Sequence, residues 1–182
     1  MSAQAQEKLY TVDYIEALPE GQRAELIDGV LYDMATPSRT HQRLVHHFDR
    51  VIGNYIVEKG GSCEVNPAPF AVYLNRDDYN YFEPDITVIC DPSKLDDKGC
   101  HGAPDWIIEI VSPSSKYMDY VRKMLKYQAA GVREYWIVDA QKRYIAVYNF
   151  ESKTMDSYTL SDKIPVGIYN GDLQIDFSAL NI

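Results

Sequence analysis

Apolar residues recur at helical spacing in three segments of the chain, with polar residues between them. The first segment is residues 11–21, and the second is residues 41–61, which ends at two glycines. The third covers roughly residues 117–130 and stops at Gly131. The residues expected on the inner side of this third helix are Val121, Met124, Leu125 and Gln128.

Short apolar runs separated by turn residues predict strands in the rest of the chain. Residues 24–35 are typical of a hairpin, because Asp28-Gly29 is a dipeptide that tight primed turns prefer. Further strands are expected within residues 63–74, 81–90, 103–112, 133–150 and 152–160. Residues 90–104 are expected to form a long polar loop, and the end of the chain a tail. The pattern predicts one α/β domain over residues 1–182, with a mixed central β-sheet flanked by helices.

The composition is that of a protein that folds in water, with 46% hydrophobic and 25% charged residues. No apolar run is long enough to cross a bilayer, and the N-terminus lacks the pattern of a signal peptide. Three cysteines, Cys63, Cys90 and Cys100, are odd in number and not at metal-ligand spacing. We therefore expect a cytoplasmic protein with reduced cysteines, no disulfide framework, no zinc site and no membrane partner.

The net charge of −9 weighs against a nucleic-acid partner, because phosphate backbones attract basic surfaces. The charge is unevenly distributed, however. Between Ser114 and Arg133 there are five basic residues and one acid. Between Ser38 and Arg50 there are three arginines and three histidines, opposed only by Asp49.

One acidic residue, Glu109, lies inside the apolar run DWIIEIVS, where a charged carboxylate is costly unless it is paired, hydrogen-bonded or bound to a metal. Alternation along a strand puts Ile107, Glu109 and Val111 on one face. Asp85 stands near the start of the preceding strand. If these strands pair in antiparallel fashion, two carboxylates meet on one face and repel each other unless a cation or a shared proton joins them.

Mg²⁺ suits such a pair, because it is commonly held by one or two carboxylates together with water and substrate phosphate oxygens. Taken alone, each acid is more simply explained as a core ion pair or an edge residue. The two together on adjacent strands favour a metal site. Asp119, Lys123, Lys126 and Tyr127 share one stripe of the following helix. A lysine of this stripe can reach the site, although spacing alone favours an exposed Asp119–Lys123 pair.

These residues resemble the Uma-two (Uma2) family of restriction endonucleases, formerly a domain of unknown function, within the PD-(D/E)XK nuclease superfamily. The matching segments are AELIDGVLYDM, PSRTHQRL, EPDITVICDPSKLDDKGCHGAPDWIIEIVSPSS, the spacing of Asp119, Lys123 and Tyr127, and AGVREYWIVD. They extend roughly from Thr11 to Tyr148. The resemblance implies a restriction-endonuclease-like fold and metal-dependent cleavage of DNA.

The resemblance assigns roles to individual residues. Asp85 matches the aspartate of the family's first half-motif, and Glu109 matches the acid of the second. The family pattern asks for a lysine two residues after Glu109, where this chain has Val111. In related nucleases this lysine can move to the following helix, which makes Lys123 the matching residue and Lys126 the second candidate.

The implied cofactor is Mg²⁺ (or Mn²⁺), held by Asp85 and Glu109 with the carbonyl of Ile110, while Lys123 orients or helps to deprotonate the attacking water. Glu25 matches an upstream acid of the superfamily, and the alternative is a solvated acid at a strand end. His41 starts the second helix and is a further candidate, and the alternative is a contact with helix backbone.

The implied partner is DNA, whose phosphates would contact the bases between Ser114 and Arg133. A two-fold homodimer is expected, because nucleases that cut duplex DNA often act as dimers. Two alternatives stay open, since fold alone does not define function. One is a catalytically inactive nuclease-fold binding module, favoured by the net charge and by Val111. The other is a metal-dependent hydrolase of a non-nucleic-acid phosphate substrate.

Overall fold

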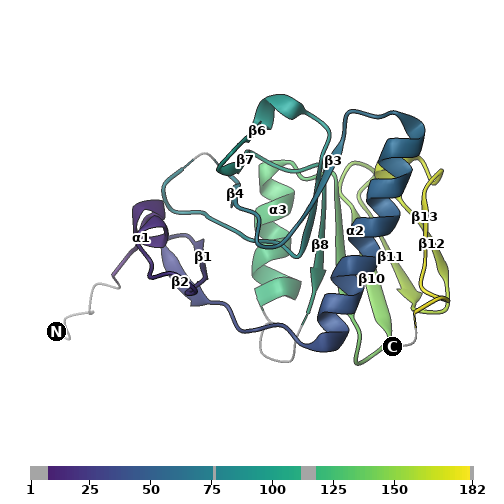
Figure 1. The fold of residues 1–182 in the computed structure, drawn as a ribbon, viewed down its shortest axis with the longest axis horizontal. Helices are drawn as coiled ribbons and strands as arrows, with labels where there is room; N and C mark the ends of the chain where they lie inside the picture. The colour runs from purple at the N-terminus through teal and green to yellow at the C-terminus, as the bar shows by residue number, and fades with distance from the viewer. Residues whose placement is uncertain (1–7, 76, 112–117, 181–182) are drawn as a thin grey trace.

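A six-stranded mixed sheet forms the centre of the computed structural model, which describes residues 8–75, 77–111 and 118–180 (Figure 1). The strand order is β11-β10-β9-β8-β5-β3. Their bounds are β3 (Glu64–Pro67), β5 (Ile86–Ile89), β8 (Trp106–Ile110), β9 (Glu134–Asp139), β10 (Tyr144–Asn149) and β11 (Thr154–Thr159). Strands β8 and β9 are parallel, and the other neighbours are antiparallel. The predicted α/β fold with a mixed central sheet is confirmed.

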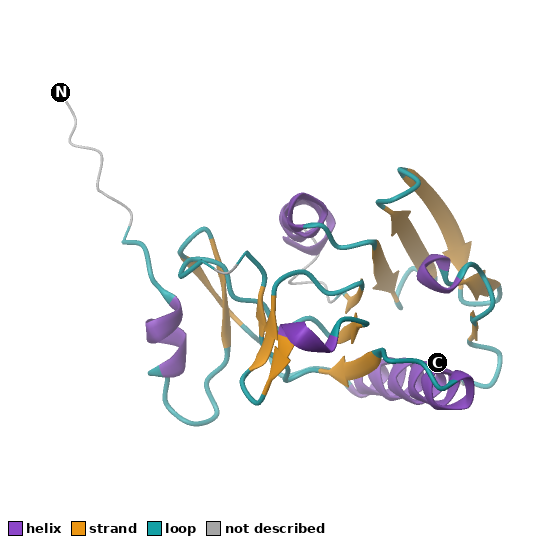
Figure 2. Cartoon of the chain, turned by 90° about the horizontal axis from the view of Figure 1, so that it is seen from above, coloured by secondary structure: helices purple, strands orange, loops and turns teal. Residues whose placement is uncertain are grey.

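Helices cover the two faces of this sheet, with α2 (Arg39–Lys59) on one side and α3 (Met124–Ala130) on the other (Figure 2). The Ser38 hydroxyl accepts a hydrogen bond from the amide of His41 and so caps the start of α2. Gly60, with φ of 64°, ends it. The short helix α1 (Val12–Glu16) lies near the N-terminus, as expected.

Strand β8 divides its side chains between the two cores. Trp106, Ile108 and Ile110 pack with α2 on one face of the sheet. Ile107 and Val111 pack on the opposite face, with α3. The predicted alternation is therefore confirmed, and it places Glu109 on the side of α3.

The inner side of the third helix differs from the prediction. Val121 and Leu125 are 41% and 55% exposed, and Gln128 is exposed as well. Met124 packs against the core as predicted, and the buried side chains of the helix beside it are Lys123 and Tyr127. Lys123 and Tyr127 point inward because they pair with buried carboxylates. The helix also begins as a π-helical segment, η2 (Met118–Lys123), which departs from the period of 3.6 residues on which the prediction was based.

Smaller sheets flank the central one. The predicted hairpin is confirmed as β1 (Ala24–Ile27) and β2 (Val30–Asp33), with positive φ at both Asp28 and Gly29. The expected polar loop at residues 90–104 is more ordered than predicted. It contains η1 (Pro92–Lys94), β6 (Leu95–Asp96) and β7 (Gly99–His101), and β7 also pairs with β4 (Val72–Tyr73).

The expected C-terminal tail is instead part of the core, so this prediction is wrong. The elements there are β12 (Lys163–Pro165), η3 (Gly167–Tyr169) and β13 (Gln174–Asp176). Ile164 and Ile175 are fully buried in the core that α2 covers, and Phe177 packs against Phe48. Alternating single apolar residues in a polar segment gave too weak a periodic signal to predict this hairpin.

Replacing Ile175 with valine is expected to lower the free energy of unfolding by about 1 kcal/mol, because one buried methylene is lost from a packed site. Urea denaturation of the purified protein measures the effect. The matched control is Val57→Ala on α2, where the side chain is 82% exposed and the change is expected to be near zero. Equal, negligible effects of the two variants would show that the C-terminal hairpin does not contribute to the core.

A disulfide joins Cys63 to Cys90, contrary to the expectation of reduced cysteines. The register explains the pairing, because Glu64 lies opposite Ile89 and the next pair outward is Cys63 and Cys90. Counting cysteines along the sequence does not reveal such a cross-strand neighbour. Cys100 is buried and takes no part in the disulfide, and its thiol donates to the carbonyl of Gly102. In the part of the chain that the structure describes, no helix combines the length and apolar character that crossing a bilayer requires.

Candidate active site

The two acids singled out in the sequence meet at one end of the central sheet. Strands β5 and β8 are antiparallel, with Ile86 opposite Ile108. Continuing this register by one step places Asp85 opposite Glu109. Opposite residues of an antiparallel pair point to the same face, with Cβ atoms roughly 5 Å apart. The sheet therefore brings both carboxylates to the point where β5 begins and β8 ends.

Asp85 is held by two donors and remains 14% exposed at its side chain. Its Oδ2 accepts a hydrogen bond of 2.7 Å from the amide of Ile110. Its Oδ1 lies 3.0 Å from Nε2 of His41, at the start of α2. The imidazole of His41 therefore contacts the candidate site, and the amide of His41 donates to the Ser38 hydroxyl at the start of the helix. The amide and carbonyl of one strand residue point to the same side, so the carbonyl of Ile110 also faces the Asp85 side.

Lys123 lies between two buried glutamates. Its Nζ is 3.0 Å from Oε1 of Glu109 and 2.9 Å from Oε2 of Glu25. All three side chains are 6–8% exposed. Because Lys123 is buried, it does not form the exposed ion pair with Asp119 that spacing alone favoured. The side chain of Asp119 itself lies outside the described residues. The ammonium thus offsets the repulsion between carboxylates that come from β1 and β8.

Glu25 is anchored by the backbone as well as by Lys123. Its Oε1 accepts a hydrogen bond of 3.0 Å from the amide of Glu83, two residues before Asp85. The residue is 6% exposed, so the alternative of a solvated acid at a strand end is wrong. The neighbouring Glu83 has partners of its own, because Arg23 and the Tyr81 hydroxyl contact its carboxylate.

Tyr127 completes this cluster and was not among the residues that the sequence assigned to the site. Its hydroxyl donates a 2.8 Å hydrogen bond to Oε1 of Glu109, the same oxygen that Lys123 contacts. Burial, and then the negative charge of Glu109, raises the pKa of Tyr127 well above its usual value. The phenol therefore stays protonated and acts as a donor. The sequence did contain a signal for its role, because Tyr127 is four residues after Lys123 and residues at this spacing share one helix face.

The Tyr127→Phe variant is expected to lower the free energy of unfolding by about 1.5–3 kcal/mol, because a buried charged carboxylate loses a donor. Chemical denaturation measures the loss. Tyr79→Phe is the matched control, because this tyrosine is 47% exposed. A loss no larger than that of the control would show that the hydroxyl of Tyr127 contributes nothing to holding Glu109.

The structure separates Lys126 from this cluster. Its ammonium contacts Asp28 in the β1–β2 turn, away from Glu109. Other bases expected to receive phosphates also have partners within the chain. Arg133 pairs with Asp105 and Glu151, and Arg122 donates to the Tyr32 hydroxyl. Lys116 lies outside the described residues. The described part of this segment is thus largely occupied by internal contacts.

The cluster contains more negative than positive groups. Glu25, Asp85 and Glu109 provide three carboxylates, and Lys123 and His41 are the basic side chains that contact them. Among the described residues, no group of three or more His, Cys, Asp or Glu side chains is arranged to hold a metal. Two carboxylates and a backbone carbonyl nevertheless fit Mg²⁺, which takes oxygen ligands and usually keeps several waters.

Comparisons with known proteins agree on a family and on a fold. A family model described as "Uma2: Putative restriction endonuclease" matches residues 11–166. An uncharacterized protein of Synechocystis sp. is 25% identical over 129 residues, which are 70% of this chain and 66% of that protein, just under two thirds of its length.

A solved structure provides the second similarity. It is a protein of Anabaena variabilis described as a "putative nuclease belonging to DUF820". The match covers 92% of this chain and 94% of that one, with a TM-score of 0.74 and 20% sequence identity. At this identity the similarity establishes the fold alone.

Proposed function

The chain belongs to the Uma2 family, and from this premise we propose that it is a metal-dependent endonuclease that hydrolyses phosphodiester bonds in DNA. The observation that carries the proposal is the convergence of Asp85 and Glu109 at one end of the sheet, with Lys123 in contact with Glu109. The order of these groups follows the half-motifs of the PD-(D/E)XK superfamily that the sequence resembles.

In this proposal, the carboxylates of Asp85 and Glu109 and the carbonyl of Ile110 hold Mg²⁺ or Mn²⁺. The metal, when bound, supplies an activated water and stabilises the negative charge of the cleaved phosphate. The protein sets the positions of these oxygens. The amide of Ile110 and the imidazole of His41 fix Asp85, and the hydroxyl of Tyr127 fixes one oxygen of Glu109.

Lys123 replaces the lysine of the family motif, because this chain has Val111 at the position where the motif has that lysine. Two carboxylates within 3.0 Å favour its charged form. A charged ammonium orients a water through its N–H groups and stabilises negative charge on a phosphate oxygen. We therefore assign Lys123 to water positioning and charge stabilisation. Glu25 contributes by holding the ammonium next to Glu109.

Purified protein incubated with plasmid and with single-stranded DNA, in Mg²⁺ or Mn²⁺ and in EDTA, tests the proposal. Cleavage that requires metal supports it. If the protein binds metal but neither cleaves DNA nor retains it at low salt, the result would favour hydrolysis of a small phosphate compound. Absence of both cleavage and calorimetric metal binding would favour an inactive module. Size-exclusion chromatography with light scattering tests the homodimer that duplex cleavage favours.

A further inference from the structure

The Cys63–Cys90 disulfide ties the edge strand β3 to β5. Cys63 immediately precedes β3 and Cys90 immediately follows β5, so the bond closes the end of the strand pair where β3 begins. The third cysteine takes no part, because Cys100 is fully buried on β7, where its thiol donates to the carbonyl of Gly102. The chain therefore has one cysteine pair that can open and close, without a competing exposed thiol.

Apart from this bond, strand β3 is held weakly. It is four residues long, lies at the edge of the central sheet and contains no buried residue. Its last residue, Pro67, has no N–H group to donate to a partner strand. Elements with few buried contacts are the ones that open most readily in a folded protein. The covalent tie at Cys63 is thus a large part of what keeps β3 in place.

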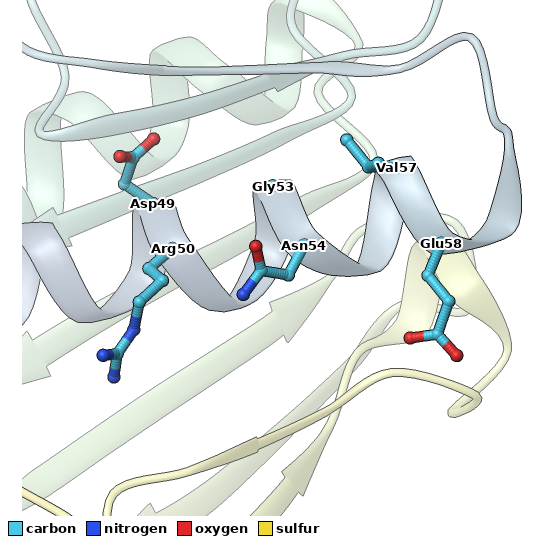
Figure 3. Close-up of a pocket in the computed structure, with 6 residues that line it drawn as sticks. All are labelled: Asp49, Arg50, Gly53, Asn54, Val57 and Glu58. Atoms are coloured by element: carbon cyan, nitrogen blue, oxygen red, sulfur yellow. The ribbon is translucent and has the colours of Figure 1, made fainter.

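Helix α2 covers β3 only in part. The chain leaves α2 beyond Glu58 and turns back, so that the following segment runs beside the helix (Figure 3). Gly53 marks the contact between them, because a Cβ atom added there would lie 3.5 Å from Cγ1 of Val65. The same glycine lines an open pocket of about 560 Å³ on α2. The packing of β3 on α2 therefore borders open space.

The surroundings of Cys63 are also open. A Cβ atom added to Gly60 or Gly61 would meet no atom within 4 Å, and Ser62 is exposed. Cys63 and Cys90 are themselves half-buried rather than enclosed in the core. A thiol of another molecule therefore has access to Sγ of Cys63 from the side of the three residues that precede it.

The other end of β3 contacts the candidate active site. The amide of Ala68, the residue after β3, donates a 3.0 Å hydrogen bond to the carbonyl of Asp85. The hydroxyl of Thr87 on β5 donates a 3.2 Å hydrogen bond to the carbonyl of Asn66 on β3. Loosening β3 thus removes two restraints next to Asp85, whose carboxylate is a proposed metal ligand.

We propose that Cys63 and Cys90 form a reversible thiol–disulfide switch that controls the candidate active site through β3. The control of catalysis rests on the proposed nuclease function, whereas the opening of the disulfide does not. The odd number of cysteines predicted a reducing compartment, and disulfides found in such compartments are usually transient and redox-sensing.

The reductant of this switch is a dithiol. Its thiolate attacks Sγ of Cys63, the bond between the two Sγ atoms breaks, and the Cys90 thiolate leaves and takes up a proton. The second thiolate of the reductant then attacks the mixed disulfide and releases Cys63, which takes up the second proton. Two electrons and two protons pass to the cysteine pair, and the reductant becomes a disulfide.

Reduction is expected to free β3 and to slow cleavage. Because the bond closes a loop over a separation of 27 residues, opening it should lower the melting temperature by roughly 5–15 °C. Amide hydrogen exchange in β3 should become at least about 10-fold faster, at times when the central strand β9 is still protected. Metal-dependent DNA cleavage should fall on the order of 10-fold, because a small displacement of a catalytic group is costly.

The experiment reduces the purified protein with excess dithiothreitol, desalts it, and then reoxidises one half with oxidised glutathione. Labelling with iodoacetamide and mass spectrometry count the accessible thiols without denaturation. None is expected in the oxidised protein, two in the reduced protein and none after reoxidation. The melting temperature, exchange in β3 and plasmid cleavage in Mg²⁺ should follow the thiol count in both directions.

Two variants assign the response to this pair. The double variant Cys63→Ser, Cys90→Ser should match reduced wild type and ignore the reductant, and Cys100→Ala should respond as wild type does. If dithiothreitol opens no disulfide in the folded protein, or if both forms cleave DNA equally fast, the inference is overturned and the nuclease function stands. If neither form cleaves DNA while exchange in β3 follows the thiol count, the nuclease function fails and the thiol switch of β3 stands.

Discussion

Replacing Glu109 with glutamine is expected to reduce metal-dependent DNA cleavage on the order of 10³-fold, which corresponds to about 4 kcal/mol of transition-state stabilisation. Glutamine keeps the shape of the side chain but removes the negative charge that the proposed metal requires. The amide also replaces a carboxylate that accepts hydrogen bonds from Lys123 and Tyr127. Asp85→Asn is expected to have an effect of the same size, since the two carboxylates form one site.

The measurement is the initial rate of plasmid cleavage in Mg²⁺, together with calorimetric titration of the metal. Both variants are expected to lose measurable Mg²⁺ affinity and to retain DNA binding in EDTA. Glu58→Gln is the matched control, because it makes the same chemical change at an exposed position on α2. A Glu109→Gln variant that cleaves as fast as this control would rule out Glu109 as a metal ligand.

The part of the site that the sequence predicted depends on short-range rules. The period of two along a strand placed Glu109 and Val111 on one face, and a neighbouring strand carried Asp85 near its start. Antiparallel pairing of β5 and β8 then brought the two acids together. These relations involve adjacent residues or adjacent strands, so the sequence contains enough information to state them.

Relations between distant segments could not be predicted in the same way. Glu25 and Lys123 are 98 residues apart, and their contact depends on how the β1–β2 hairpin packs next to α3. Apolar spacing predicted Val121 and Leu125 on the inner side of the helix, yet the buried carboxylates drew Lys123 inward. Hydrophobic periodicity therefore failed where a buried charge determined the orientation of the helix.

Charge along the chain was similarly ambiguous. Both basic segments stood out in the sequence, and the segment before Arg133 was expected to contact DNA. In the structure, Lys123, Lys126 and Arg133 neutralise acids of the same chain, whereas Arg39 and Arg50 remain exposed. A count of charges does not separate bases that stabilise the fold from those available to a partner, because the pairing partners lie far away in sequence.

Replacing Lys123 with methionine is expected to lower the free energy of unfolding by about 3–5 kcal/mol, because removing one partner leaves buried charges without compensation. Glu25 and Glu109 would then face each other at 6–8% side-chain exposure without the ammonium between them. For a chain of this size the loss corresponds to a melting temperature roughly 6–20 °C lower.

The double variant Glu25→Gln, Lys123→Met separates charge from packing. With one glutamate neutral, the repulsion disappears, and the double variant is expected to recover more than half of the stability lost by Lys123→Met alone. Calorimetric melts of wild type, both single variants and the double variant give the coupling energy between the two side chains. Additive losses, with no recovery, would mean that Lys123 stabilises the protein through its aliphatic chain. The buried ammonium would then not be what holds the two glutamates together.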